Sequence, residues 1–294
     1  MRIVSLLPSA TEILFELGLG DDVVGVTFEC NFPPAARTKR IVSTSALPEG
    51  LDAAGIDAVV KERMTAGEDL YRLDRDAFAD LDPELVVTQD LCAVCAVDVS
   101  EVDDALAYLG CRAEVLTLDP MTLDEVLDSI LEVGATTGAE IAAGRLVERS
   151  RARLGATAAL VAGGRRRATL VLEWTDPAFT GGHWVPDMVE AAGGESVHGF
   201  PGANSQGVEW STIVGSDAEV VLVAPCGYRL DGAADLAATV LDRVPPDSEV
   251  WAIDADAVVV RPGPRIVEGV EVMAAILHPE RCGRPDPERA RRIR

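Results

Sequence analysis

Short β-branched runs alternate with helical segments along most of the sequence, and this alternation constrains the fold more than any other feature. The chain opens on the apolar run Ile3–Leu7, which breaks at Pro8 and continues into an apolar helical segment. Similar extended runs recur at residues 23–26, 41–43, 85–88 and 114–118. Alternating strands and helices are typical of parallel sheets whose faces are covered by helices. Residues 1–120 therefore predict an α/β lobe.

A second α/β region follows a long helical stretch that contains no proline. Thr122 and Glu125 have the spacing of a capping box, which predicts a helix start, and the stretch 139–161 is long enough to connect two lobes. Extended runs are then predicted at 168–173, 220–224 and 250–254, with helices over 185–192, 236–243 and 265–277. The tail Cys282–Arg294 is polar and is expected to fray. The predicted organisation is an N-terminal lobe at 1–120, a linking helical segment at 121–163 and a C-terminal lobe at 164–294.

Composition excludes several classes of partner. The chain has 294 residues of which 48% are hydrophobic, enough for a substantial core in each of two lobes. Its net charge of −23 argues against binding to nucleic acid or to an anionic membrane surface. No apolar run reaches the roughly 18 residues of a membrane-spanning helix, so no membrane insertion is expected.

The start of the sequence bears on the expected compartment. A secretory leader needs a basic end and an apolar run of about 7–15 residues before the fold begins, whereas the first predicted strand starts at Arg2. We therefore expect a cytoplasmic location. Thiols stay reduced there, so the six cysteines favour metal binding or catalysis over disulfides.

Several segments, taken in order, resemble one known family. They are residues 2–12, 17–19 with 24–27, 81–87, 176–182 with 188–194, and 262–269. This set is similar to the cobalamin-binding, class III substrate-binding proteins of ABC importers. The resemblance implies an α/β fold of two sandwich lobes joined by one long helix. It also implies that a small-molecule ligand, a cobalamin or related corrinoid, is held in the cleft between the lobes. The sequence does not by itself predict a surface for docking to an ABC permease.

Candidate ligand-binding residues follow from the rule that ligands of open α/β sheets lie outside the carboxyl ends of the strands. In the first lobe this rule selects Ser9, Glu29 and Gln89. In the second lobe it selects Trp174, Phe179, His183, Trp184 and Tyr228. The aromatic residues suit a large planar ligand. The imidazole of His183 could coordinate cobalt or iron axially, although a loop histidine with no such role is the alternative.

Four cysteines fall on the same predicted loops: Cys30, Cys92, Cys95 and Cys226. Together they could form a four-thiolate site for zinc or an iron–sulfur cluster. The pair Cys92 and Cys95 could instead cycle as a dithiol, or these residues could be small buried hydrophobic groups.

Two functions therefore remain open at this stage. The first is a cytosolic homologue of substrate-binding proteins that binds a corrinoid. The second is a metal or iron–sulfur protein, with a redox or sulfur-handling enzyme among the alternatives, that uses the cysteines in the same cleft. No phosphate-binding glycine loop, Ser–His–Asp arrangement or HExxH motif is present, which disfavours an enzyme.

Overall fold

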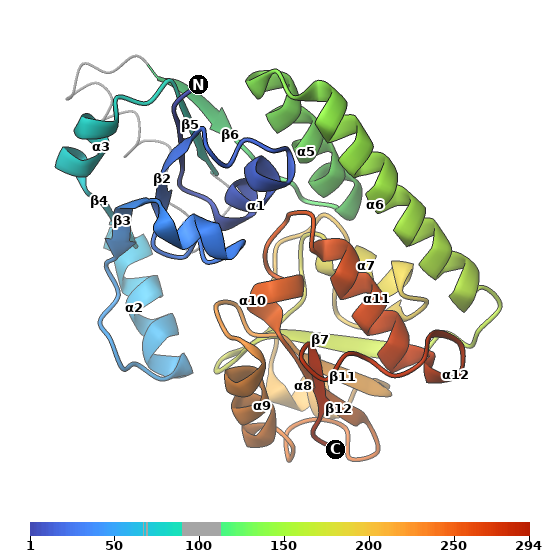
Figure 1. Ribbon diagram of the computed structural model, residues 1–294. Helices are drawn as coiled ribbons and strands as arrows, with labels where there is room; N and C mark the ends of the chain where they lie inside the picture. Colours follow the sequence, from blue (N-terminus) through green and yellow to red (C-terminus); the bar gives the residue numbers. More distant parts are fainter. Residues whose placement is uncertain (67, 69, 90–112) are drawn as a thin grey trace. The chain divides into compact units, whose positions relative to one another are not determined.

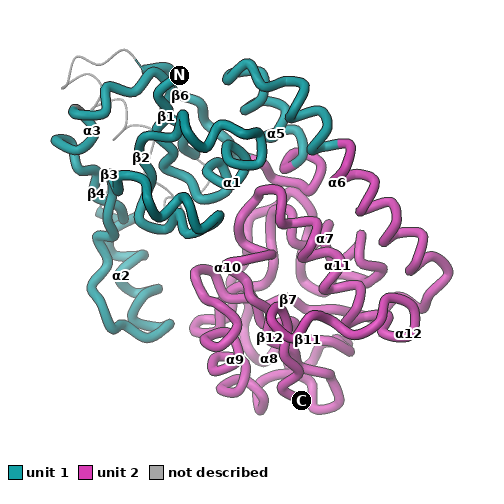
Figure 2. The backbone as a smooth tube through the Cα atoms, viewed as in Figure 1, with its two compact units in different colours: residues 1–119, 127–147 teal, residues 120–126, 148–294 magenta. Residues whose placement is uncertain are grey.

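The computed structural model describes residues 1–66, 68, 70–89 and 113–294 (Figure 1). The chain divides into two compact units (Figure 2). Unit 1 comprises residues 1–119 and 127–147, and unit 2 comprises residues 120–126 and 148–294. Helix α6, Glu140–Val161, is continuous through the junction at 147–148, and helix α5, Leu123–Thr137, crosses the junction at 126–127.

Unit 1 is built on a largely parallel sheet with strand order β4-β3-β2-β1-β5-β6. Its strands are β1 Ile3–Ser5, β2 Val23–Thr27, β3 Arg40–Ser45, β4 Tyr71–Leu73, β5 Leu85–Thr88 and β6 Glu114–Thr117. Only the pairing of β3 with β4 is antiparallel in the part that is described. The buried strands are hydrophobic on consecutive residues, as expected for a sheet covered on both faces.

Local signals in the sequence set the helices in the first 89 residues of unit 1. They are α1 Pro8–Glu16, a 3-10 turn at Pro34–Thr38, α2 Ala53–Ala66 and α3 Arg75–Leu81. Pro8 occupies the first turn of α1, where its missing N–H is not needed. The Asp74 carboxylate accepts the Ala77 backbone N–H at 2.9 Å and so caps α3. Phe78 of α3 is fully buried in the core beside Val4 and Val86.

Unit 2 has a mixed sheet with strand order β10-β8-β7-β11-β12-β13, and β9 pairs separately with β7. Its strands are β7 Ala168–Thr175, β8 Ala178–Thr180, β9 Glu195–Ser196, β10 Gln206–Gly207, β11 Val220–Val223, β12 Glu249–Ile253 and β13 Ala290–Arg292. Its helices are α7 Val185–Ala191, α8 Trp210–Val214, α9 Leu230–Thr239, α10 Ala255–Val258, α11 Ile266–Leu277 and α12 Pro279–Cys282. The core includes Leu170, Leu172, Val221 and Val223 of the central strands.

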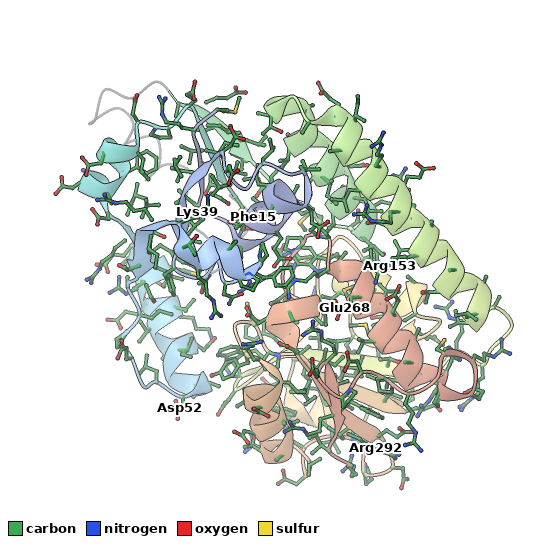
Figure 3. The ribbon with its side chains drawn as sticks, viewed as in Figure 1. Phe15, Lys39, Asp52, Arg153, Glu268 and Arg292 are labelled. Carbon is green, nitrogen blue, oxygen red and sulfur yellow. The ribbon has the colours of Figure 1, made fainter. Side chains whose placement is uncertain are left out.

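The capping box predicted before the linking segment is confirmed. The Glu125 N–H donates to the Thr122 hydroxyl at 3.2 Å, and the Glu125 carboxylate accepts the Thr122 N–H at 3.1 Å. Helix α5, Leu123–Thr137, starts at this point. Within unit 2, Arg153 of α6, labelled in Figure 3, makes a bidentate pair with Glu271 of α11 at 2.9 and 2.6 Å. This pair ties the second half of α6 to the unit 2 helices.

The C-terminal tail is ordered, and the prediction that Cys282–Arg294 frays is wrong. Strand β13 pairs antiparallel with β12, matching Trp251 with Arg292. The Arg294 guanidinium donates to the carbonyl oxygens of Leu241, Pro245 and Ser248 and to the Ser248 hydroxyl. A polar sequence can therefore be held by side-chain hydrogen bonds to a distant loop. The predicted helix over 236–243 is likewise corrected, because α9 runs from Leu230 to Thr239.

Replacing Arg294 with alanine should measurably destabilise unit 2. The change leaves three carbonyl oxygens without their charged donor, and a hydrogen bond to a charged group contributes about 1.5–3 kcal/mol net, less where water can replace the donor. We expect a net loss of about 1–3 kcal/mol in the free energy of unfolding by urea. Arg291→Ala, which removes only an exposed pair with Asp231, should cost less than about 1 kcal/mol. Equal losses in the two variants would contradict this role of Arg294.

Candidate functional site

The strand register of unit 2 brings several predicted residues to one edge of its sheet. Leu172, Val223 and Ala252 are register partners on the parallel strands β7, β11 and β12. The chain therefore leaves all three strands at the same carboxyl edge. The Cys226 N–H donates to the Glu173 carbonyl at 3.1 Å and the Asp256 N–H to the Tyr228 carbonyl at 3.1 Å, which ties the three loops together.

Three aromatic side chains lie at this edge: Trp174, Phe179 and Tyr228, which we call the aromatic ledge. The rings of Trp174 and Tyr228 meet edge-on, with centroids 5.8 Å apart and planes at 64°. Phe179 is the cross-strand partner of Trp174 in the β7–β8 hairpin, so the two side chains share one face of the sheet. All three are only partly buried. The ledge therefore keeps aromatic surface that a ligand can cover.

Local hydrogen bonds and packing hold the ledge in place. The Trp174 indole N–H donates to the Asp176 carbonyl at 3.1 Å. The Tyr228 ring packs over Gly232, where a Cβ atom would lie 2.8 Å from a ring carbon, so only glycine leaves room for the ring. The ledge is thus preorganised rather than dependent on a ligand for its order.

The loop 181–184 after β8 carries His183 and Trp184. The His183 N–H donates to the Ala203 carbonyl at 2.6 Å, and its carbonyl accepts the Gly202 N–H at 3.1 Å. Burial lowers the pKa of His183, and a hydrogen bond to the Asn204 side chain partly opposes this shift. The imidazole is therefore held mainly neutral at pH 7.

Trp184 has a different position from that of the ledge residues. Its side chain is 7% exposed, and its indole N–H donates to the Val259 carbonyl at 2.8 Å. Its ring lies 5.7 Å from that of His183. The structure therefore places Trp184 in the packing beneath the loop, where it supports His183.

In unit 1, predicted residues also lie at the carboxyl edge of the sheet, and one residue there was not predicted. The Tyr71 hydroxyl donates to the Glu29 carboxylate at 3.0 Å, and the Tyr71 ring lies 6.0 Å from that of Phe28, which is 39% exposed. Gln89, directly after β5, is buried. Tyr71 comes from the short antiparallel strand β4, whose three residues carry no recognisable strand signal in the sequence.

Ser9 lies at the start of α1, also at this edge of unit 1. It is 1% exposed, and its hydroxyl oxygen has no hydrogen-bond partner in the part of the chain that the structure describes. A buried hydroxyl without a partner is uncommon, since such groups cost about 1–3 kcal/mol. Ser9 thus retains unused hydrogen-bonding capacity next to the strand ends.

The described cysteines give no support to a four-thiolate site. Cys30 is buried in unit 1, with its sulfur 3.0 Å from the Thr11 hydroxyl, and Cys226 is half-buried in unit 2. Cys92 and Cys95 lie outside the described residues. Among the residues that are described, no three histidine, cysteine, aspartate or glutamate side chains are grouped so as to hold a metal ion. Zinc sites need three or four such ligands.

A charged cluster around one buried carboxylate follows β12, and the sequence-based reasoning missed it. Asp254 has a side chain only 4% exposed, with one carboxylate oxygen 3.4 Å from Arg289 and the other without a hydrogen-bond partner among the described residues. Arg289 also donates to Glu268 at 2.5 Å. Burial raises the pKa of Asp254, partly opposed by Arg229 and Arg289.

This raised pKa predicts a pH dependence of stability. Above the ordinary Asp pKa of about 3.9, the unfolded chain ionises at this position before the folded chain does. Any stability that Asp254 contributes is therefore fully present below the pKa of the unfolded chain. It is lost as the pH rises through the higher pKa of the folded chain. Wild type should lose stability relative to Asp254→Asn as the pH rises across this window, measured by urea unfolding at a series of pH values. A difference that does not change with pH would contradict the assignment.

Among the described residues, none of the helices has both the length and the apolar character needed to span a membrane.

Comparisons with known proteins agree with this architecture. A family model described as "Periplasmic binding protein" matches residues 3–247. An uncharacterized ABC transporter substrate-binding lipoprotein, YvrC of Bacillus subtilis, is 26% identical over 297 residues, covering 95% of this chain and 80% of the relative. A cobalamin-binding protein of Halobacterium salinarum is 26% identical over 292 residues, covering 94% and 69% of the two chains.

Solved structures show the same fold at lower identity. The periplasmic vitamin B12 binding protein BtuF of Vibrio cholerae superposes with a TM-score of 0.64 at 20% identity, covering 94% of this chain and 96% of its own. The periplasmic heme-binding protein RhuT of Roseiflexus superposes with a TM-score of 0.68 at 21% identity, covering 96% and 98%. One fold thus carries ligands of more than one class.

Proposed function

We propose that this chain, which belongs to the periplasmic binding protein family, is a substrate-binding protein for a corrinoid of the cobalamin class. The observation that carries the proposal is the aromatic ledge of Trp174, Phe179 and Tyr228 at the carboxyl edge of the unit 2 sheet. The relative from Halobacterium salinarum, named as a cobalamin-binding protein, supports the same class of ligand.

The ledge suits the apolar part of a large macrocycle. Aromatic side chains offer flat contact surface with little loss of conformational entropy on binding. Ligand sites generally combine such a surface with a few hydrogen-bonding groups that fix the orientation. In unit 1, Ser9, Glu29 and Gln89 are groups of this kind at the carboxyl edge of that unit's own sheet.

Charge favours a corrinoid over haem. The chain carries a net charge of −23, and a field of this sign disfavours the approach of an anionic ligand. Haem carries carboxylates on its propionate groups, whereas the corrin periphery carries neutral amides. An uncharged periphery therefore matches this protein better than an anionic one.

Titration of the purified protein with cyanocobalamin, dicyanocobinamide and haem tests the proposal. Isothermal titration calorimetry should give a dissociation constant of about 1 μM or lower for at least one corrinoid, a binding free energy near −8 kcal/mol. Haem should bind at least about tenfold more weakly, a difference of about 1.4 kcal/mol. Failure of every corrinoid to bind at micromolar protein, or tighter binding of haem, would overturn the proposal.

A further inference from the structure

We propose that the start of helix α1 in unit 1 binds a phosphate oxyanion of the ligand. The donors are the Ser9 hydroxyl and the backbone N–H groups of Ser9 and Ala10, which we call the α1 donors. This inference rests on the proposed function and adds to it the chemical group that unit 1 recognises. In a cobalamin that group is the phosphodiester of the nucleotide loop, which cobinamide lacks.

The α1 donors lie where ligands of parallel sheets generally bind. Strand β1 ends at Ser5 and lies between β2 and β5 in the unit 1 sheet, and α1 begins soon afterwards at Pro8. The start of this helix is therefore outside the carboxyl end of a parallel strand. With nine residues, α1 is long enough to carry the partial positive charge of a helix N-terminus there.

The first turn of α1 has no cap from the chain itself. Leu7, which precedes the helix, has no side chain that could accept a hydrogen bond. Pro8 has no N–H, and Thr11 is the first helical residue whose N–H reaches a carbonyl, that of Leu7 at 3.0 Å. The N–H groups of Ser9 and Ala10 have no acceptor among the described residues. A buried helix end in this state needs a partner from outside the helix.

The residues that carry the three donors are buried. Ser9 is 1% exposed and Ala10 is fully buried. The Ser9 hydroxyl also has no hydrogen-bond partner in the part of the chain that the structure describes. Unpaired buried donors are rare, because each loses its hydrogen bonds to water without replacement. Three of them at one helix start indicate a partner that the folded chain does not supply.

Neighbouring hydroxyl groups show that the missing partner is specific to this position. The Thr11 hydroxyl donates to the Ser5 hydroxyl at 2.8 Å, and the Ser5 hydroxyl donates to the Leu7 carbonyl at 3.0 Å. The Thr11 hydroxyl also lies 3.0 Å from the sulfur of Cys30. These side chains are buried as well. The interior of unit 1 thus pairs the hydroxyls that serve only the fold, and Ser9 stands outside this network.

The chemistry of the α1 donors selects an oxyanion. Backbone N–H groups at a helix start are a common phosphate site, since the helix dipole adds to their hydrogen bonds. One phosphate group offers enough acceptor oxygens for all three donors. Two carboxylates oppose a highly charged anion: Glu12 lies one turn further along α1, and Glu29 lies at the same edge of the sheet. The single charge of a phosphodiester therefore suits the site better than inorganic phosphate does.

Calorimetric titration with cyanocobalamin and dicyanocobinamide tests the inference. Both ligands carry the corrin ring, but only cyanocobalamin carries the nucleotide loop with its phosphodiester. Wild type should bind cyanocobalamin at least about tenfold more tightly, because charge-assisted hydrogen bonds are the strong ones. Equal affinities, or tighter binding of dicyanocobinamide, would overturn the inference while leaving the proposed function intact. Absence of binding by every corrinoid would overturn both.

Ser9→Ala separates a binding role of the hydroxyl from a structural one. The variant loses an unpaired buried hydroxyl and gains helix propensity, so its melting temperature should equal or exceed that of wild type. Its affinity for cyanocobalamin should nevertheless fall by about tenfold or more, while its affinity for dicyanocobinamide should change by less than about twofold. An unchanged affinity for cyanocobalamin would contradict the assignment.

Ser5→Ala is the matched control, because Ser5 is also a buried serine of unit 1 but has a paired hydroxyl. It should lower the melting temperature and leave the ratio of the two corrinoid affinities unchanged. Loss of that ratio in both variants would show an effect of unit 1 packing rather than of the α1 donors. Titration with inorganic phosphate completes the test. Phosphate binding that is lost in Ser9→Ala, together with equal corrinoid affinities in wild type, would assign the donors to a free anion instead.

Discussion

Gly269→Ala is expected to destabilise unit 2 by about 3 kcal/mol or more, because a Cβ atom at this position would collide with the backbone. Gly269 lies on α11, where an added Cβ would sit on the carbonyl oxygen of Val258 at the end of α10 and close to the Met188 methyl group. The Met188 side chain can move, whereas the Val258 carbonyl is part of the main chain. Helix α11 must therefore shift away from α10 to accommodate the methyl group.

The measurement is urea unfolding followed by circular dichroism, with Gly144→Ala as the matched control. Gly144 lies inside α6, and nothing lies within 4 Å of the position that its Cβ would occupy. The same substitution there should stabilise the helix by about 0.5–1 kcal/mol, because alanine has the higher helix propensity. Opposite signs for the two variants are the expected result. A loss of less than about 1 kcal/mol in Gly269→Ala would show that the helix contact is not as close as the structure has it.

Much of the fold follows from signals that act within a few residues. Pro8 marks the start of α1 because its missing N–H falls where none is needed. Thr122 and Glu125 satisfy one another's backbone groups, so the start of α5 is readable from four residues. Helix α6 was predictable because no proline or strand signal interrupts residues 139–161.

The elements that were missed depend on distant partners. Strands β4, β8, β10 and β13 have three residues or fewer and pair antiparallel with neighbours, so their stability comes from the adjoining strand rather than from their own composition. Arg294 holds the tail through carbonyl groups near residues 241–248. No pattern in the neighbouring residues predicts such a contact.

The candidate site was predictable only to the level of strand ends. The rule that selects residues after parallel strands places Trp174 and Tyr228 at one edge, and their rings are in contact. The rule does not show which side chains turn into the core. Trp184 is one of these, and its indole N–H donates a hydrogen bond to the Val259 carbonyl. The rule also overlooks Tyr71, which lies on the antiparallel strand β4 and bonds to Glu29.

Trp174→Ala should produce the largest loss of ligand affinity among single changes to the aromatic ledge. Buried tryptophans at binding surfaces commonly contribute 2 kcal/mol or more when truncated to alanine, and this indole also contacts the Tyr228 ring edge-on at 5.8 Å. We therefore expect corrinoid affinity to fall by about 30-fold or more. Trp174→Phe keeps a ring against Tyr228 and should recover most of the affinity.

The dissociation constant must be measured by calorimetry or corrin absorbance, because replacing Trp174 also removes a tryptophan whose fluorescence would report binding. Trp251→Ala is the control. This residue lies in the middle of β12, with its indole N–H directed to Glu249 at 3.3 Å, away from the carboxyl edge. It should lower the melting temperature but change the dissociation constant by less than about threefold, which is under 1 kcal/mol. If both tryptophan variants weaken binding equally, the effect is one of unit 2 stability and the ledge does not contact the corrinoid.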